Sequence, residues 1–246
     1  MIAKKRCDFH AQGIGHGIWC RPAESRGDYC EAFRLVYRQY CSAGLSRANP
    51  TSMRIAPYQL LPECETIVVE RHSRIAGTLS LIGDGPKKLP LDTYFPEALE
   101  SLRQKGLKLI EVGCLASEDQ ASTQPSNVYS ALTRATIQHA NLGQYDRMIA
   151  AVHPRHCKLY ERGMGFRRIS EVVKCDMVEG NLAVCVAGNP GDPEAYSQPW
   201  RDIFFAGSNL DFVQRTNPMS PADRLYFSRL LEIGAQSIPG TGRRVA

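Results

Sequence analysis

Residues 107–116 read LKLIEVGCLA, and after a helical stretch the chain returns to a second apolar run, RMIAAV, at 147–152. The first run alternates as a strand does, which places Glu111 and Gly113 on one face and Cys114 on the other. The second run is short and apolar throughout, as is typical of a strand buried on both faces. The two runs predict neighbouring parallel strands joined by a helical crossover.

Upstream of this pair the sequence predicts a helix, a hairpin and a second helix. Asp28 is the expected N-cap of an amphipathic helix that Gly44 can end. The β-branched runs 65–71 and 73–82 predict an antiparallel hairpin. Pro96 suits the first position of a short helix that leads into the central strand. The first helix is expected to bury a stripe made of Cys30, Phe33, Val36, Tyr37 and Tyr40.

Downstream of the pair, Pro154 opens the expected helix RHCKLYER, and the segments 166–177 and 182–187 predict a last hairpin. Two C-terminal amphipathic helices are expected to begin at Asp192 and Ser220. Their apolar stripes need cover, by default from the core and otherwise from a partner subunit or a lipid chain. The stripes contain Tyr196, Trp200, Ile203 and Phe204 in the first helix and Leu225, Phe227, Leu230 and Leu231 in the second.

Composition limits the class of protein. A chain of 246 residues with 43% apolar residues can bury a large core, and a net charge of +5 suits an acidic partner without the dense basic runs of a nucleic-acid binder. Nine cysteines without a Cys-x-x-Cys pair, and no apolar run near the ~20 residues that span a bilayer, predict a cytoplasmic protein with reduced thiols. No metal site is expected, because the spacing of Cys7, His10, His16 and Cys20 fits no common zinc module.

Two side chains of the central strand invite a chemical interpretation. Glu111 lies among apolar neighbours, so it is either paired for structural reasons or placed at a solvated strand end, or else burial raises its pKa toward a value that suits a general base. Ideal strand geometry points Cys114 away from Glu111, which favours a buried and inert thiol over an acylated nucleophile.

The ordered motifs GTLSLI at 77–82, EVGCLA at 111–116, HPRHCKLYERGMGF at 153–166 and VEGNLAV at 178–184 resemble those of bacterial N-acyl amino acid synthases. These belong to the Gcn5-related N-acyltransferase (GNAT) superfamily and are similar in fold to acyl-homoserine-lactone autoinducer synthases. The resemblance implies an α+β fold, an α/β/α sandwich with a mixed, mostly antiparallel, splayed sheet flanked by helices. The resemblance covers about residues 28–188. The expected division of the chain is a loosely ordered segment at 1–26, the acyltransferase domain at 27–188 and a helical C-terminal extension at 189–246 that packs on the core.

The resemblance also implies an enzyme that transfers a long-chain fatty acyl group from acyl carrier protein to the amine of an amino acid acceptor. Glu111 would be the general base, Tyr160 the proton donor to the leaving sulfur, and His153 a ligand of the acceptor carboxylate. The alternatives are a ring packed against the sheet for Tyr160 and a helix-entry hydrogen bond for His153. Substrate binding is expected from Gly113, Cys114, Leu115, Arg134 and Ser80; Ser80 and Cys114 stand where the family usually has arginine.

The donor follows from the loop after the central strand. The segment LASEDQASTQPSNVYS contains no glycine, so it is ill-suited to cradle the pyrophosphate of coenzyme A. A phosphopantetheine-linked acyl thioester on a carrier protein is therefore expected as substrate, with no tightly bound cofactor. Arg155, Lys158, Arg162, Arg167 and Arg168 form the expected docking patch for an acidic carrier, or else a solvated basic face.

Two other functions remain open from the sequence. An acyl-CoA-dependent small-molecule N-acetyltransferase is disfavoured by the missing glycine loop. A catalytically silent acyl-carrier or lipid-binding protein is kept open by the two lost arginines. The predicted C-terminal helices could also wall an acyl tunnel or make peripheral lipid contact.

Overall fold

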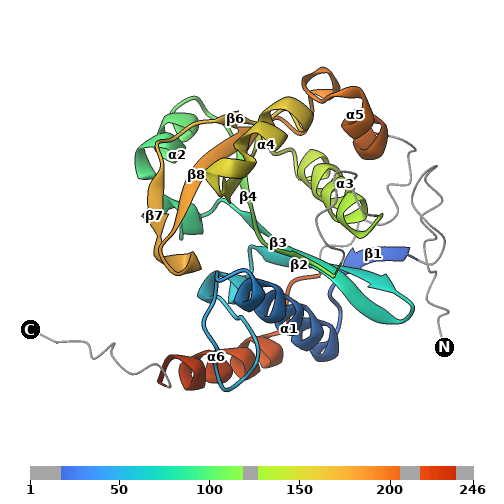
Figure 1. Cartoon of the computed structure of the whole chain (residues 1–246), viewed down its shortest axis with the longest axis vertical. Coiled ribbons are helices and arrows are strands. Elements are labelled where there is room, and N and C mark those ends of the chain that lie inside the picture. Colours follow the sequence, from blue (N-terminus) through green and yellow to red (C-terminus); the bar gives the residue numbers. More distant parts are fainter. Residues whose placement is uncertain (1–17, 119–126, 206–216, 237–246) are drawn as a thin grey trace, which may run out of the picture.

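The computed structural model describes residues 18–118, 127–205 and 217–236, which form one sheet covered by helices on both faces (Figure 1). Its strands are β1 (Ile18–Pro22), β2 (Cys64–Arg71), β3 (Arg74–Gly83), β4 (Leu109–Ser117), β5 (Arg147–Val152), β6 (Arg167–Arg168), β7 (Val173–Cys175) and β8 (Asn181–Gly188). The helices are α1 (Arg26–Ser42), α2 (Pro96–Arg103), α3 (Asn127–Leu142), α4 (Cys157–Gly163), α5 (Gln198–Phe205) and α6 (Pro221–Gln236). Short 3-10 helices are η1 (Pro57–Leu60), η2 (Pro90–Thr93), η3 (Pro154–His156), η4 (Asp176–Val178) and η5 (Pro193–Ala195).

The strand order is β1-β2-β3-β4-β5-β8-β6, with β7 paired to β8. All these pairs are antiparallel except β4 and β5, which run parallel with α3 between them in sequence. The predicted mixed, mostly antiparallel sheet and the predicted parallel central pair are confirmed. The hairpin of β2 and β3 is confirmed too, and its two turn residues, His72 and Ser73, both adopt positive φ, as a tight hairpin turn requires.

Each face of the sheet has its own cover. On one face α3 and α5 pack a continuous apolar cluster that includes Val128, Leu132 and Trp200. On the other face α1 and α6 cover one half of the sheet, and α2 with β7 covers the other half. Figure 1 shows α1 and α6 side by side below the sheet and α3 above it. This arrangement buries the sheet on both sides, as the apolar strands require.

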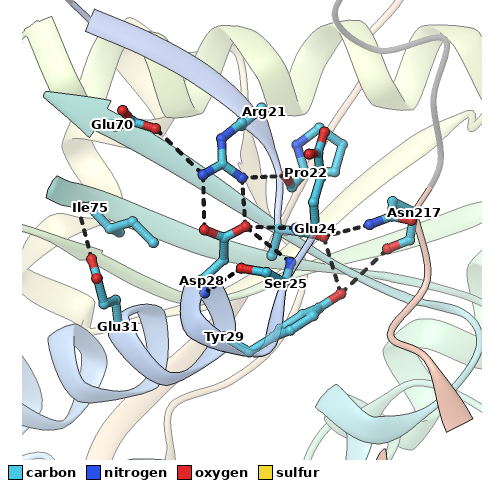
Figure 2. A network of polar contacts seen from close by, with 11 residues as sticks. Arg21, Pro22, Glu24, Ser25, Asp28, Tyr29, Glu31, Glu70, Ile75 and Asn217 are labelled. Atoms are coloured by element: carbon cyan, nitrogen blue, oxygen red, sulfur yellow. Dashed lines mark hydrogen bonds and ion pairs between the residues drawn. The ribbon is translucent and has the colours of Figure 1, made fainter. Parts of the chain in front are cut away.

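The N-terminus of α1 is fixed by a polar corner (Figure 2). Ser25 is the N-cap, and it exchanges hydrogen bonds with Asp28 in a capping box, so the prediction of Asp28 as the N-cap itself was wrong. Arg21 of β1 donates to both carboxylate oxygens of Asp28, at 2.7 and 2.9 Å. Although burial opposes its charge, hydrogen bonds from Arg21 and nearby backbone amides lower the pKa of Asp28 to about 2. The corner ties the first strand to the first helix.

The buried stripe of α1 differs from the predicted one. The helix buries Tyr29, Ala32, Phe33, Leu35 and Val36. Of the predicted stripe, Phe33 and Val36 are buried, whereas Cys30, Tyr37 and Tyr40 are half-exposed. The buried face of α1 is therefore rotated from the predicted one. Tyr29 and Phe33 of α1 both pack against Phe227 of α6, a contact that the sequence pattern of α1 alone does not contain.

Strand β1 was missed from the sequence. Residues 18–22, IWCRP, alternate between buried and half-buried side chains and pair antiparallel with β2. The segment 1–26 is therefore not wholly a loosely ordered lead-in. Strand pairing with β2, which lies more than forty residues further along the chain, supplies the order that local periodicity did not reveal.

The last hairpin is interrupted. Its first arm forms two short strands, β6 and β7, both paired with β8. Between them the Ser170 hydroxyl accepts a hydrogen bond from the Cys185 backbone amide at 2.8 Å, so a side chain replaces a strand carbonyl there. Ile169 still donates its backbone N–H to the Cys185 carbonyl.

The C-terminal region docks on the core at two places. Asp192 caps η5, and α5 follows with Trp200 and Phe204 buried, so the single helix expected from Asp192 is two elements. In α6, Phe227 is buried against Phe33 of α1, with ring centroids 5.0 Å apart. Leu225, which was predicted to share that stripe, is 55% exposed. Docking on the core, the default expectation, holds for both helices.

Cysteines in the described ranges are all free thiols, and the same ranges contain no group of three or more His, Cys, Asp or Glu that could hold a metal. Cys20 is buried in β1, while Cys7, His10 and His16 lie outside the described residues. Within those ranges, no helix is both long and apolar enough to cross a membrane.

Candidate active site

The central parallel strands separate shortly after they pair. Strand β4 pairs with β5 only from Leu109 to Glu111, although β5 continues to pair with β8 as far as Val152. A cavity of about 680 Å³, counted with the space at its mouth, occupies the widening gap. It is lined by residues 112–115 of β4 and 150–152 of β5, by Tyr129 and Thr133 of α3, by Tyr160 of α4 and by Phe204 of α5. A mostly apolar cavity at a strand splay is suited to a thin, partly apolar ligand.

A β-bulge brings Cys114 to the face on which Glu111 lies. In the register with β3, Gly113 pairs with Ser80 and Ala116 pairs with Thr78, so two residues of β4 face the single Leu79. Cys114 adopts φ +50°, an uncommon conformation for a residue with a side chain, and its thiol joins the cluster beneath α1. The prediction that Cys114 points away from Glu111 was therefore wrong, because it assumed an ideal strand. Cys114 remains buried, as predicted, at 5% exposure.

Glu111 is the last residue of β4 that pairs with β5, so it lies where the splay begins. Its carboxyl group is buried on the face covered by η2 and α2, and its Oε2 accepts a hydrogen bond from the Leu91 backbone amide at 3.0 Å. Burial raises the pKa of Glu111 to about 8, with a smaller contribution from the charge of Asp92, while the Leu91 hydrogen bond opposes the shift. A carboxyl group with this pKa can accept a proton near neutral pH.

Tyr160 lines the cavity from α4. Its ring also makes an edge-on contact with Phe166, with centroids 5.6 Å apart. Burial raises the pKa of Tyr160, and a hydrogen bond with Tyr129 opposes part of that shift. The hydroxyl is therefore protonated at neutral pH and faces the cavity region, and its ring packs as the alternative interpretation expected.

His153 serves as a cap. Its Nδ1 accepts a hydrogen bond from the Arg155 backbone amide at 3.2 Å, at the start of η3. It is not among the residues that line the cavity. The structure therefore shows the alternative predicted for His153, a helix-entry hydrogen bond. Binding of the acceptor carboxylate by His153 stays a prediction.

Ser80 holds a loop over the strand rather than opening onto the cavity. Its hydroxyl accepts a hydrogen bond from Gln59 Nε2 at 2.9 Å, and Gln59 Oε1 accepts one from the Ala56 backbone amide. The loop before η1 is thereby fixed beside Gly113. Ser80 therefore acts on the site through the loop it positions.

Of the other residues predicted to bind substrate, three line the cavity and one does not. Gly113, Cys114 and Leu115 line the cavity. Arg134 is buried in α3 and is not among the lining residues, and burial lowers its pKa. The structure thus supports the backbone of the bulge, and not Arg134, as part of the cavity.

The predicted docking residues lie together on the outer surface of η3, α4 and β6. All five are exposed, and Tyr160 lies on the same short helix as two of them. Arg168 contacts Glu171 at 3.0 Å, and Arg155 donates to His156. The five are Arg155, Lys158, Arg162, Arg167 and Arg168, named here the basic patch. The basic patch thus shares α4 with Tyr160, which lines the cavity.

Three functional candidates escaped the sequence analysis. Arg54 donates to the Cys114 thiol, with Nη1 and Sγ 3.3 Å apart, and the Tyr58 hydroxyl lies 3.2 Å from the same sulfur. Tyr40 lines the cavity and lies beneath the Arg54 guanidinium, 4.7 Å from its Cζ. In the sequence, only a weak signal pointed to this group: a cation, Arg54, and an aromatic residue, Tyr58, in a segment without helical or strand periodicity.

Comparison with known proteins agrees with this geometry. Residues 31–189 match the family model described as N-acyl amino acid synthase FeeM. The structure of FeeM, an N-acyl amino acid synthase from uncultured soil microbes, superposes with a TM-score of 0.64 at 21% identity, over 73% of this chain and 95% of that one. No match is found among curated proteins.

Two autoinducer synthases share the fold. The acyl-homoserine-lactone synthase LasI gives a TM-score of 0.55 at 12% identity, over 78% of this chain and 95% of LasI. BjaI, a CoA-dependent acyl-homoserine lactone synthase, gives 0.57 at 12% identity, over 87% of this chain and all of BjaI. These identities establish a shared fold.

Proposed function

Because this chain belongs to the FeeM family of N-acyl amino acid synthases, and is thus an acyltransferase, we propose that it transfers a long-chain fatty acyl group from acyl carrier protein to the amine of an amino acid. The observation that carries the proposal is the cavity in the strand splay. It is mostly apolar and opens beside the bulge of β4. Glu111, a base with a raised pKa, is not itself a lining residue but directly precedes the lining residue Val112 on β4.

The proposed reaction is direct attack by the amine. The acyl thioester enters the cavity with its carbonyl beside the bulge of β4, and Glu111 takes a proton from the acceptor amine, directly or through water. Attack on the carbonyl carbon gives a tetrahedral oxyanion, which backbone amides near Cys114 can stabilise. Collapse breaks the carbon–sulfur bond, and Tyr160 protonates the departing thiolate. No metal is required for these steps.

The carrier-bound donor is supported by one feature of the sequence and one of the surface. The loop after β4 has no glycine with which to cradle a pyrophosphate, and it carries Glu118. The basic patch instead offers five cations beside the helix that bears Tyr160. Acyl carrier proteins are acidic, so the patch is complementary to them in charge.

The decisive experiment follows free thiol released from palmitoyl-loaded acyl carrier protein, with and without the twenty amino acids, and identifies products by mass spectrometry. Amino-acid-dependent release with an N-acyl product is expected. A parallel reaction with palmitoyl-CoA tests the donor, and Glu111→Gln is the matched variant with an uncharged side chain.

Each other outcome has a clear meaning. Turnover of palmitoyl-CoA in preference to the carrier-bound donor would overturn the choice of donor and leave the synthase. Absence of any product, with acyl carrier protein still bound tightly, would overturn the enzymatic proposal and favour a catalytically silent acyl-carrier or lipid-binding protein. Equal product from wild type and Glu111→Gln would remove Glu111 as the base.

A further inference from the structure

Arg54 is a half-buried cation that contacts only neutral groups within the described part of the chain. Its Nη2 donates to the Met177 carbonyl at 2.7 Å, its Nη1 donates to the Cys114 sulfur, and its guanidinium lies over the Tyr40 ring. Among the residues that the structure describes, no carboxylate pairs with it.

Only some of the other partly buried arginines of this chain pair with carboxylates, since Arg147 and Arg224 donate to backbone carbonyls. Arg21 binds Asp28 at 2.7 Å, and Arg103 binds both Asp84 and Asp92 at 2.7 and 2.6 Å. Removing a cation from water without a counter-charge is costly, so such groups normally have an anionic partner. Arg54 therefore has the properties of a cation that awaits an anionic ligand.

The position of Arg54 indicates that its anionic ligand is one of the substrates. Two of its partners, Tyr40 and Cys114, line the cavity, so the guanidinium lies at the edge of the space that the substrates would enter. The loop that carries Arg54 is fixed by Gln59, which bonds to Ser80 of β3. The cation is thereby held by the scaffold and not by an ion pair that a ligand would have to break.

Arg54 and Glu111 both lie on the face of β4 to which the Cys114 thiol points. Between them lies Gly113, where an added Cβ would meet only Ile82 at 3.7 Å and Tyr58 at 3.9 Å. Glu111 and Gly113 are about 7 Å apart along the strand, a span on the scale of a small zwitterion held by charge-assisted hydrogen bonds of about 2.8 Å.

We propose that Arg54, with the Tyr58 hydroxyl beside it, binds the α-carboxylate of the acceptor and so directs the amine toward Glu111. This assignment rests on the proposed function and deepens it, because it makes a free carboxylate part of acceptor recognition. Amino acids are then acylated in preference to their amides, in which the negative charge is absent.

The test compares an amino acid that the wild type acylates with its carboxamide. Arg54→Gln is expected to lower kcat/KM for the acid about 10- to 100-fold, the range of a lost charge-assisted hydrogen bond, and to change the amide little. Arg54→Lys should restore part of the preference for the acid. Arg34→Gln, on the exposed side of α1, is the matched control and should leave the ratio unchanged.

An unchanged ratio of kcat/KM for the acid to kcat/KM for the amide in Arg54→Gln would overturn the proposal. If both values fell to the same extent, the role of Arg54 would be the loop contact with Met177. Should the wild type transfer no acyl group, ligand-induced thermal shifts with the acid and its amide decide the question separately. Stabilisation by the acid that Arg54→Gln removes would retain the carboxylate site and reject the synthase. Equal shifts with acid and amide would reject the carboxylate site.

Discussion

At the scale of single residues, the bulge at Cys114 decides how the site is assembled. A residue with a side chain at positive φ is strained by about 1 kcal/mol or more, and such strain is common where a strand is bent for function. Here the bend places the Cys114 thiol among Arg54 and Tyr58, on the same face of the sheet as Glu111. The site therefore depends on an irregularity that a regular strand pattern does not contain.

The first prediction concerns Glu111 as base. Because burial holds its pKa near 8, the carboxyl group is mostly protonated at neutral pH, and the rate should rise with pH until it levels above about 8. Glu111→Gln should lower kcat about 10²- to 10⁴-fold and abolish that rise. Single-turnover rates between pH 6 and 9.5 check this, and a wild-type profile that is flat over that range would contradict it.

The same substitution should also change how the stability of the fold depends on pH. Between an unfolded pKa of about 4.3 and the folded pKa near 8, the folded protein holds a proton that the unfolded chain has released. The contribution of Glu111 to stability therefore declines as pH rises through this window. Glu111→Gln should remove the decline and be more stable at pH 8, on the order of a few kcal/mol, in urea unfolding.

At the scale of elements, α3 approaches the sheet closely over Gly77 of β3. A Cβ added at Gly77 would overlap Val128 and come within 3.0 Å of Leu132 Cδ1, both on α3. Lack of a side chain at this position lets the crossover helix lie directly on the strand, and this packing positions Tyr129 and Thr133 at the cavity.

The second prediction tests this close packing. Gly77→Ala should lower the free energy of unfolding by about 1–3 kcal/mol, the usual cost of an overpacked core. Gly27→Ala in the first turn of α1 is the control, because its added methyl would make only ordinary contact and alanine favours helix. Urea midpoints at an unchanged m-value measure both, and equal midpoints for Gly77→Ala and wild type would contradict close packing.

The third prediction concerns α5, which closes the cavity through Phe204. Phe204→Ala should extend the cavity and shift preference toward longer acyl chains. Since each buried methylene contributes about 0.8 kcal/mol, two extra methylenes should gain about 10-fold in relative kcat/KM. Ile203→Ala, a neighbour outside the cavity lining, is the control. Competition between donors of mixed chain length gives the ratio, and an unchanged ratio would place the end of the acyl chain elsewhere.

At the scale of the whole molecule, the basic patch and the helices α1 and α6 lie on opposite sides of the sheet. The basic patch lies on the side of α4, whereas α1 and α6 cover the opposite side (Figure 1). Cations near an active site increase the encounter rate with an acidic partner more strongly than cations on a distant face.

The fourth prediction tests docking at this scale. Reversal of Arg155, Lys158 and Arg162 to Glu should raise KM for the carrier-bound donor by about 10-fold, with a smaller effect at high salt, and leave KM for an acyl-pantetheine donor unchanged. Reversal of the exposed Arg34, Arg74 and Arg229 alters net charge equally on other surfaces. An equal rise in KM for both triple variants would show a net-charge effect and not a docking site.

The sequence by itself determined most elements, the parallel central pair and the position of Glu111 among apolar neighbours on its strand. These features follow from local signals, namely periodicity, caps and breakers, which act over a few residues and survive in any context. Strand β1 and the interrupted last hairpin escaped because pairing partners decided them.

Only the tertiary structure decided which side chains meet. Arg54 and Cys114 are sixty positions apart, and their contact depends on a bulge set by the register with β3 and on a loop held by Gln59. His153 became a cap because the adjacent backbone amide of Arg155 needed an acceptor. Residue types and spacing limit the chemistry that a chain can perform, but contacts across long separations arise from packing of the whole sheet, which no local pattern encodes.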